Sequence, residues 1–378
     1  MLAVGVNLLW CRPGQVGGSE EYLARQLVGL AAVAPEIRGR LVVPPAFPEA
    51  HPELVERFAI VVGPEATRAR RSSRLLAEAR SLPSMLGEVD VVHHAGGTLP
   101  ARTGRTRRQR TPTVLTIHDI QYLRFPEYFS AARRTYLRLR LPASARQADV
   151  IAVPSEFVKG TVVDAYGVDV AKVLVVPHGV DPPAAGEVGD PDELRRRYGL
   201  GGRRVLVYPA ITHPHKGHGF LINLLAGPWS DPDLVLVLLG SQGAAEEAVA
   251  QAIRDAGITA RVVRPGRVPD ADRDGLIALA DALVFPSEYE GFGAPVLEAM
   301  SLGTPVICSD QAALPEVAGE AAQVLPLRVD AWAGALDVIA ADRDDWIERG
   351  RRRAAQFTTA RSGSALADAY RLAMKARP

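Results

Sequence analysis

The sequence predicts two α/β domains in tandem, each built on a parallel sheet with helices on both faces. Three observations carry this prediction. The chain has 378 residues, more than one ordinary hydrophobic core accommodates. Short apolar runs alternate with helix-length amphipathic patterns, as in a doubly wound sheet. A stretch rich in Pro and Gly at residues 178–191 interrupts this alternation, which then restarts.

Before the interruption, apolar runs predict the strands of a first domain that spans residues 1–180. The predicted strands are 4–9, 41–43, 59–62, 89–93, 114–117, 150–153 and 173–176. Helical patterns follow several of them, at 20–31, 73–86, 131–147 and 156–165. Because these strands are apolar on both faces, we expect them to be parallel and buried between layers of helices.

After the interruption, the same alternation predicts a second domain that spans residues 190–358. Its predicted strands are 205–208, 234–239, 261–263, 282–285, 306–308 and 323–325. Its predicted helices are 219–225, 244–256, 272–280, 295–302 and 329–340. A last helical pattern at 361–376 can pack on either domain, and we assign the segment 361–378 to the first domain.

The composition is that of a soluble globular protein, with 47% hydrophobic and 23% charged residues. No stretch of about 20 apolar residues is present, so no membrane span is expected. The apolar start, Met1–Trp10, follows no basic segment and leads into a glycine-rich loop, which favours a strand over a signal peptide. Nothing requires Cys11 and Cys308 to pair, so we expect a reduced, cytoplasmic chain.

Arginine residues are concentrated in the first domain. Residues 1–180 carry a net charge of +7 and residues 181–378 a net charge of −6, within a total of +1. The arginines cluster at 68–74, 102–110 and 133–140. They either attract an anionic acceptor or the inner face of an anionic membrane, or simply decorate solvated loops. No nucleic-acid partner is expected, because no aromatic residues are interleaved with the 102–110 run.

In open α/β sheets, ligands bind beyond the carboxyl ends of the strands, and we therefore expect a site in a cleft between the two domains. The most informative segment is 285–306, in which a strand ends at Phe285 and a loop carries Glu290, Gly291, Phe292 and Gly293. Pro295 suits the first position of the following helix, and the free N–H groups there suit a pyrophosphate. Glu298 is expected in the first turn, where its carboxylate can bind the diol of a ribose, while Glu290 can bind sugar hydroxyls.

The segment 285–306 resembles the retaining GT-B glycosyltransferases of family 4, and the resemblance extends over essentially the whole chain. Two glutamates separated by seven residues are the hallmark of that family, and Glu290 and Glu298 match them. The resemblance implies that Glu290 contacts the donor sugar and that Glu298 contacts the ribose. It also implies a donor-contacting role for Gly291, Phe292 and Gly293.

The segment 208–218 follows the first strand of the second domain, where a phosphate is expected. Lys216 can neutralise a diphosphate, and a lysine at a helix start is unfavourable unless an anion is present. Lys216 matches the phosphate-binding lysine of the family. The family commonly has an arginine about five residues earlier, where this chain has Ile211, and His213 or His215 can substitute for it. The form of this segment resembles mannosyltransferases and favours GDP-mannose as the donor.

The strand end at Thr116–Ile117 places His118 and Asp119 at the expected site. Adjacent residues on a strand face opposite ways, so these two are not expected to form a catalytic dyad. In the resembled family this histidine contacts the donor sugar and helps to place the acceptor. The alternative is that Asp119 caps a helix and His118 is structural.

Two glycine-containing turns complete the expected donor site. Gly17 and Gly18 allow the loop before a helix to approach the donor or the acceptor, with Ser19 as a plausible N-cap. By resemblance, the backbone at Gly266 and Val268 meets the nucleotide base. Two Asp-x-Asp patterns, at 231–233 and 270–274, have the spacing of a metal site but are interpreted as solvated surface, so no metal and no cofactor is expected.

The chain is therefore predicted to be a metal-independent, retaining hexosyltransferase. It would move a sugar, with mannose favoured, from a nucleotide-diphosphate donor to a glycan, lipid-linked or small-molecule acceptor. No protein nucleophile is evident, which favours front-side displacement. The alternatives are a GT-B phosphorylase, a sugar-nucleotide epimerase, or a two-domain sugar-binding protein without enzymatic activity.

Overall fold

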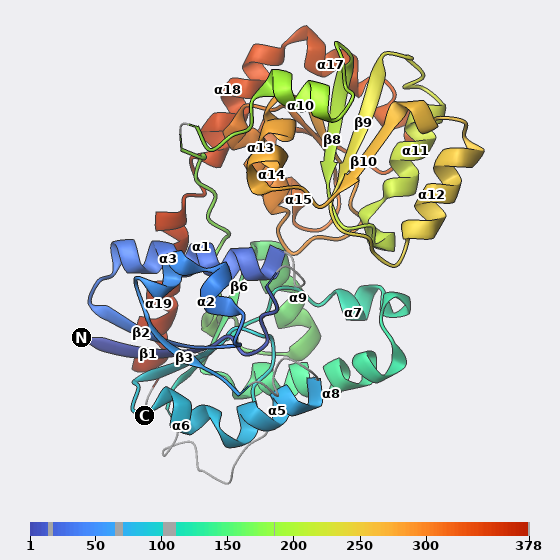
Figure 1. Cartoon of the computed structure of the whole chain (residues 1–378). Coiled ribbons are helices and arrows are strands. Elements are labelled where there is room, and N and C mark those ends of the chain that lie inside the picture. The colour runs from blue at the N-terminus through green and yellow to red at the C-terminus, as the bar shows by residue number, and fades with distance from the viewer. Residues whose placement is uncertain (14–17, 65–70, 101–110, 185, 377–378) are drawn as a thin grey trace. The chain divides into compact units, whose positions relative to one another are not determined.

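The computed structural model describes residues 1–13, 18–64, 71–100, 111–184 and 186–376 (Figure 1). The chain divides into two compact units, Met1–Gly179 with Thr358–Pro378, and Val180–Phe357. Each unit is built on a purely parallel sheet. The prediction of two doubly wound α/β units is confirmed.

The first unit contains a seven-stranded sheet in the order β3-β2-β1-β4-β5-β6-β7. Its strands are β1 Leu2–Asn7, β2 Ile37–Val43, β3 Ala59–Val62, β4 Val91–His94, β5 Thr113–Thr116, β6 Val150–Val153 and β7 Val173–Val175. Its helices are α1 Gly18–Val33, α2 Phe47–Ala50, α3 Pro52–Val55, α5 Arg71–Arg80, α6 Leu82–Leu86, α7 Gln121–Arg124, α8 Ala131–Gln147, α9 Glu156–Tyr166 and α19 Thr359–Lys375.

Helices cover both faces of this sheet. Val4 and Val6 of β1 belong to the core under α1 and α19. Gly5 faces the other way, where a Cβ atom would lie 2.6 Å from Leu86 of α6. The alternation within one strand thus assigns one face to α1 and α19 and the other to α6.

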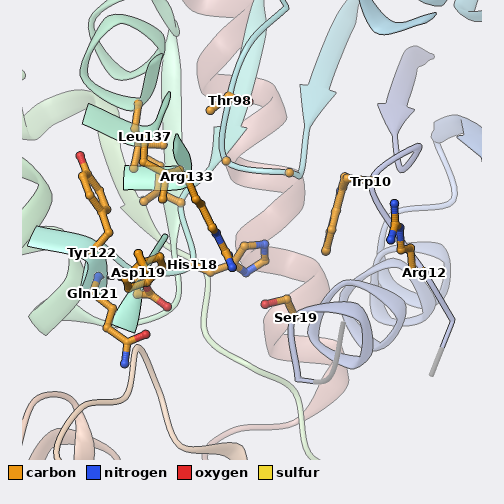
Figure 2. Close-up of a pocket in the computed structure, with 15 residues that line it drawn as sticks. Trp10, Arg12, Ser19, Thr98, His118, Asp119, Gln121, Tyr122, Arg133 and Leu137 are labelled. Carbon is orange, nitrogen blue, oxygen red and sulfur yellow. Dashed lines mark hydrogen bonds between the residues drawn. The ribbon is translucent and has the colours of Figure 1, made fainter. Parts of the chain in front are cut away.

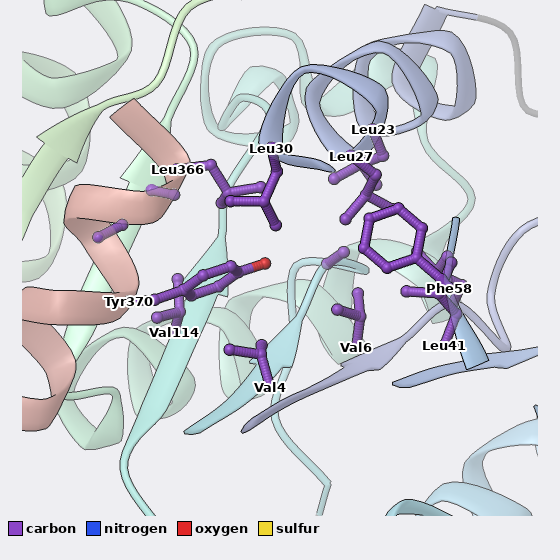
Figure 3. Packing of buried hydrophobic residues seen from close by; sticks show 14 of the residues in the cluster. Val4, Val6, Leu23, Leu27, Leu30, Leu41, Phe58, Val114, Leu366 and Tyr370 are labelled. Atoms are coloured by element: carbon purple, nitrogen blue, oxygen red, sulfur yellow. The ribbon is translucent and has the colours of Figure 1, made fainter. Parts of the chain in front are cut away.

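The last helix, α19, packs on α1 across a pair of glycines. Gly29 of α1 and Gly363 of α19 meet backbone to backbone, so that a Cβ on either residue would lie about 2 Å from main-chain atoms. Tyr370 of α19 is buried, and its hydroxyl shares a 2.9 Å hydrogen bond with Nδ1 of His93 in β4. Figure 3 shows Leu366 and Tyr370 gathered with α1 side chains over the strands.

Two adjacent histidines at the end of β4 make the stability of the first unit depend on pH. Burial, with electrostatic repulsion from His94 and His118 acting in the same direction, lowers the pKa of His93 to about 3. Burial also lowers the pKa of His94 to about 4. The unfolded chain, with a histidine pKa of about 6.5, binds more protons at pH 5 than the folded chain does. Stability is therefore present above pH 6.5 and lost as the pH falls toward 4.

Between pH 7 and pH 5 each of these histidines should cost about 2 kcal/mol of folding free energy. Calorimetry of the first unit's unfolding at both pH values checks this loss. His51 acts in the opposite direction, because hydrogen bonds to Glu20 and Glu53 outweigh burial and raise its pKa. His94→Asn should lose less stability than the parent over the same interval, and an equal loss in both proteins would contradict the assignment.

The second unit contains a six-stranded sheet in the order β10-β9-β8-β11-β12-β13. Its strands are β8 Arg204–Pro209, β9 Leu234–Leu239, β10 Val262–Gly266, β11 Ala282–Phe285, β12 Val306–Ser309 and β13 Gln323–Leu325. Its helices are α10 Pro191–Arg197, α11 His218–Ala226, α12 Glu246–Asp255, α13 Asp270–Ala278, α14 Ala294–Leu302, α15 Leu314–Ala318, α16 Val329–Trp332, α17 Ala335–Ala341 and α18 Arg343–Ala354.

Candidate active site

In the second unit the strand order reverses between β8 and β11, and the loops after these two neighbouring strands carry the predicted donor residues. Tyr208, at the end of β8, ties the loops together. Its hydroxyl donates to the carbonyl of Lys216 at 2.5 Å and lies 3.1 Å from the hydroxyl of Ser287. The N–H of Glu288 donates to the carbonyl of His215 at 2.8 Å. Both segments are therefore fixed at the carboxyl ends of two neighbouring strands, the position at which such folds bind ligands.

Lys216 and Glu290 meet beyond these strand ends. The Nζ atom of Lys216 lies 2.5 Å from Oε1 of Glu290, and the two side chains are only 19% and 14% exposed. Gly217, which follows the lysine and caps α11, has a positive φ of 69° and passes so close to Pro286 that a Cβ would lie 2.3 Å from its carbonyl oxygen. The structure thus brings together two residues that lie 74 positions apart and that were both predicted for the site.

The helix after this loop begins with Gly293 as its N-cap, in the left-handed conformation at φ 96°. Helix α14 starts at Ala294, so Pro295 occupies the second helical position and Glu298 the second turn. The expectation that Pro295 opens the helix and that Glu298 lies in its first turn was wrong by one position, because the glycine cap lets the helix begin earlier. Phe292 is 3% exposed and packs on Phe357, so only its main chain can reach a ligand.

Glu298 lies close enough to an arginine, which the sequence did not single out, for its charge to act on that side chain. Burial opposes a charge on Arg273 of α13, yet the carboxylates of Glu298, Asp274 and Asp270 hold its pKa above the ordinary value. Its Nε atom bonds Asp274 at 2.8 Å. Asp272, by contrast, is 8% exposed and accepts hydrogen bonds from Tyr198 and Arg197.

The interpretation of 270–274 as solvated surface was therefore wrong for Asp272. It was wrong because α10, which supplies Arg197 immediately before Tyr198, was not predicted from the sequence. The carboxylates of Asp272 and Asp274 are engaged by cations and a hydroxyl of the chain itself. In the other pattern, Asp231 accepts a hydrogen bond from the N–H of Asp233.

The two histidines considered as replacements for an arginine at Ile211 lie beside Lys216. The rings of His213 and His215 are stacked with centroids 5.8 Å apart. Burial, followed by the charge of Lys216, lowers the pKa of His215 to about 3. His215 is therefore neutral at pH 7 and can offer a hydrogen bond but no charge to a phosphate. Gly266 ends β10 at φ 78° with open space around it, and Val268 lies half-buried two residues later.

The first unit has a pocket of about 500 Å³ at the same edge of its own sheet, where the order reverses between β1 and β4 (Figure 2). Its walls come from the segments after β1, β4 and β5 and from α8. Figure 2 shows Trp10 and Arg12 on one side, Tyr122, Arg133 and Leu137 on the other, and His118 between them. Gly96 allows the Trp10 ring to lie against the main chain, since a Cβ there would be 2.7 Å from the ring.

His118 lies two residues beyond the end of β5, in this pocket. Its Nε2 atom is 3.0 Å from the carbonyl oxygen of Ala95, which accepts a hydrogen only if Nε2 carries the proton. The Nδ1 lone pair then remains an acceptor for a ligand hydroxyl. Burial lowers the pKa of His118, so the ring is neutral at pH 7. Asp119 accepts a hydrogen bond from the N–H of Gln121, the first residue of α7, although Ile120 rather than Asp119 is the N-cap of that helix.

Gly17 lies outside the described residues, as do the arginines of 102–110. Gly18 is the first described residue of α1, and Ser19 lies inside that helix and lines the pocket, so the expectation that Ser19 is the N-cap was wrong. In the first unit, Trp10 and Arg12 were missed as residues of this pocket, and Arg133 was considered only within the arginine cluster 133–140. In the second unit, Arg273 was missed as a residue near Glu298. Periodicity marks these residues only as strand-end or helix residues, and their placement within each unit depends on contacts distant in sequence.

Two parallel α/β units with a lysine–glutamate pair at the switch point and a glycine-capped helix beside it define a GT-B glycosyltransferase. Residues 16–183 match the Glycosyltransferase Family 4 profile, and residues 190–353 match that of Glycosyl transferases group 1. The chain belongs to this family of glycosyltransferases.

Relatives and solved structures agree with this assignment. The chain is 29% identical to the O-antigen chain mannosyltransferase B of Escherichia coli, over 79% of each chain. It is 33% identical to a D-inositol 3-phosphate glycosyltransferase of Actinosynnema mirum, over 70% of this chain and 67% of the relative. Its fold resembles that of Anabaena Alr3699/HepE in complex with UDP and glucose, with a TM-score of 0.74, 19% identity and coverage of 97% and 99%.

Among the described residues, no helix is both long and apolar enough to cross a membrane.

Proposed function

We propose that this glycosyltransferase transfers a hexose, with mannose favoured, from a nucleotide-diphosphate donor to a glycan, lipid-linked or small-molecule acceptor, with retention of configuration. The observation that carries the proposal is the Lys216–Glu290 pair beside the start of α14. Mannosyltransferases among the relatives support mannose, and one of them is named for its dependence on GDP-mannose. Because the structural neighbour Alr3699/HepE was solved in complex with UDP and glucose, donors that carry uridine are included in the test.

The second unit would hold the donor. Lys216, as a point charge, and the free N–H groups at the start of α14 would neutralise the diphosphate as it leaves. The diphosphate would compete with Glu290 for Lys216, which frees the Glu290 carboxylate to accept hydrogen bonds from the donor sugar. Glu298, whose charge acts on Arg273, would accept the two ribose hydroxyls.

Retention would follow from front-side displacement. The acceptor oxygen bonds the anomeric carbon on the face that the diphosphate leaves, and the departing phosphate oxygen takes the acceptor proton. His118 would accept a hydrogen bond from a hydroxyl through Nδ1, which its bond to Ala95 leaves available. No metal or cofactor is assigned to these steps.

Thermal unfolding in the presence of individual sugar nucleotides tests the donor assignment. A ligand present at 100 times its dissociation constant stabilises the form it binds by about 2.7 kcal/mol. We expect GDP-mannose to raise the unfolding midpoint of the second unit more than UDP-glucose, UDP-N-acetylglucosamine or free mannose does. A larger shift with a uridine donor would reassign the base. Shifts of the unfolding midpoint with free sugar alone would favour a sugar-binding protein. Whether transfer retains the configuration is tested separately, by determining the anomeric configuration of the product.

A further inference from the structure

We propose that the pocket of the first unit binds an acceptor that carries a phosphate monoester or diester, held by Arg133 and Arg12. This inference rests on the proposed transferase function and specifies the chemistry of its acceptor. The pocket is large enough for a sugar-sized ligand, at about 500 Å³. Its two cations stand against a single carboxylate, that of Asp119, among the residues that line it.

The placement of Arg133 on α8 is the first argument. Arg133 lies in the first turn of this 17-residue helix, next to Arg134, and that turn contains no acidic residue. Cations at a helix N-terminus face the positive end of the helix dipole, which disfavours them unless an anion is bound nearby. Arg133, Leu137 and Leu141 line the pocket at intervals of four residues, so one face of α8 turns toward the ligand space.

The freedom of the two guanidinium groups is the second argument. Within the described part of the chain, neither Arg12 nor Arg133 forms an ion pair, and both residues are exposed, so their N–H donors are accessible to a ligand from solvent. Arg133 stacks over the ring of Phe129, with 5.1 Å from Cζ to the centroid, and this contact orients the guanidinium without consuming its N–H donors. A fork of N–H donors held in this way matches the oxygens of a phosphate.

The rest of the pocket suits the polyol part of such an acceptor. Trp10 and Tyr122 provide aromatic surface from opposite sides. His118 offers Nδ1 as a hydrogen-bond acceptor for a hydroxyl, and its ring is neutral. A phosphate bound at the N-terminus of α8 and a hydroxyl bound at His118 would therefore orient the acceptor along the pocket.

Paired probes test the anion requirement. We expect mannose 6-phosphate to bind at least about tenfold more tightly than mannose in calorimetric titrations, the size expected for one charge-assisted interaction. Vesicles of phosphatidylglycerol, compared with phosphatidylcholine, test a lipid-anchored phosphate. Preference for the soluble phosphate indicates a free phosphorylated polyol, and preference for the anionic vesicle alone indicates a lipid headgroup.

Three variants that each remove one positive charge show which arginines are responsible for the preference for anionic probes. Arg133→Gln and Arg12→Gln should each remove most of the anionic preference, whereas Arg146→Gln, in the exposed last turn of the same helix, should retain it. GDP-mannose binding to the second unit should be unchanged in all three, which separates failure of this inference from failure of the proposed function. Equal binding of anionic and neutral probes, or an Arg133→Gln protein that behaves like Arg146→Gln, would overturn the proposal.

Discussion

Replacing Glu290 with alanine is expected to lower the transfer rate by about a hundredfold or more while the fold persists. Such a loss is typical when one preorganised polar group is removed from the place where charge develops in the transition state. The variant would lose the proposed acceptor of the donor-sugar hydroxyls. It would also leave Lys216, whose side chain is 19% exposed, without the carboxylate that lies 2.5 Å away.

The measurements are the transfer rate at saturating donor and the donor affinity. Glu290→Gln keeps the size of the side chain but removes its charge, and it should also be strongly impaired. Glu247→Ala removes an exposed glutamate of the same unit, in α12, and should transfer at the parent rate. Normal turnover by Glu290→Ala would eliminate the proposed role.

A double-mutant cycle can show whether the pair acts as a unit. Lys216 and Glu290 are in direct contact, so the free-energy effects of Lys216→Ala and Glu290→Ala should not add. We expect the double variant to be little slower than the worse single variant. Fully additive losses would indicate that the two groups act on the donor independently.

The sequence was most informative where strands are buried on both faces. The runs 150–153, 234–239 and 282–285 coincide with β6, β9 and β11, because a continuous apolar run bounded by turn residues leaves little choice of element. Helix α8 was also predicted with its observed bounds.

Helices held by tertiary contacts were missed. Helix α18, Arg343–Ala354, is rich in charge and has no continuous apolar stripe, yet Gly350 packs against Met300 and Arg353 donates to the carbonyls of Glu316 and Val317. The predicted helix at 329–340 is likewise divided, into α16 and α17. Such interruptions depend on neighbours that local periodicity does not record.

In the candidate site as well, some features could be predicted from the sequence and others could not. Lys216 and Glu290 were predicted individually, from a strand end and a glycine loop, but their ion pair depends on β8 and β11 being adjacent in the sheet. The electrostatic interaction of Arg273 with Glu298 and the pocket around Trp10 depend on residues from separate segments of the chain. Motifs identify the residues of such a site, whereas the topology decides which of them meet.

The contact between α1 and α19 leads to the largest expected effect on stability. In Gly29→Ala, the new Cβ would lie 2.0 Å from the carbonyl oxygen of Thr359, which is main chain and cannot rotate away. Helix α19 would have to move, and Tyr370 with it, although its hydroxyl bonds buried His93. We expect a loss of about 3 kcal/mol, or roughly 10 °C in the unfolding midpoint of a unit of this size.

Gly160→Ala is the matched control for this substitution. Gly160 lies in α9 of the same unit, is exposed, and has no atom within 4 Å of an added Cβ. Alanine there should stabilise the unit by about 0.5–1 kcal/mol, since glycine is a poor helix former. Calorimetry should therefore show opposite shifts for the two variants, with GDP-mannose binding retained in both. Equal midpoints for Gly29→Ala and the parent would show that α19 does not approach α1 this closely in solution, because the steric conflict leaves no other outcome for a tightly packed pair.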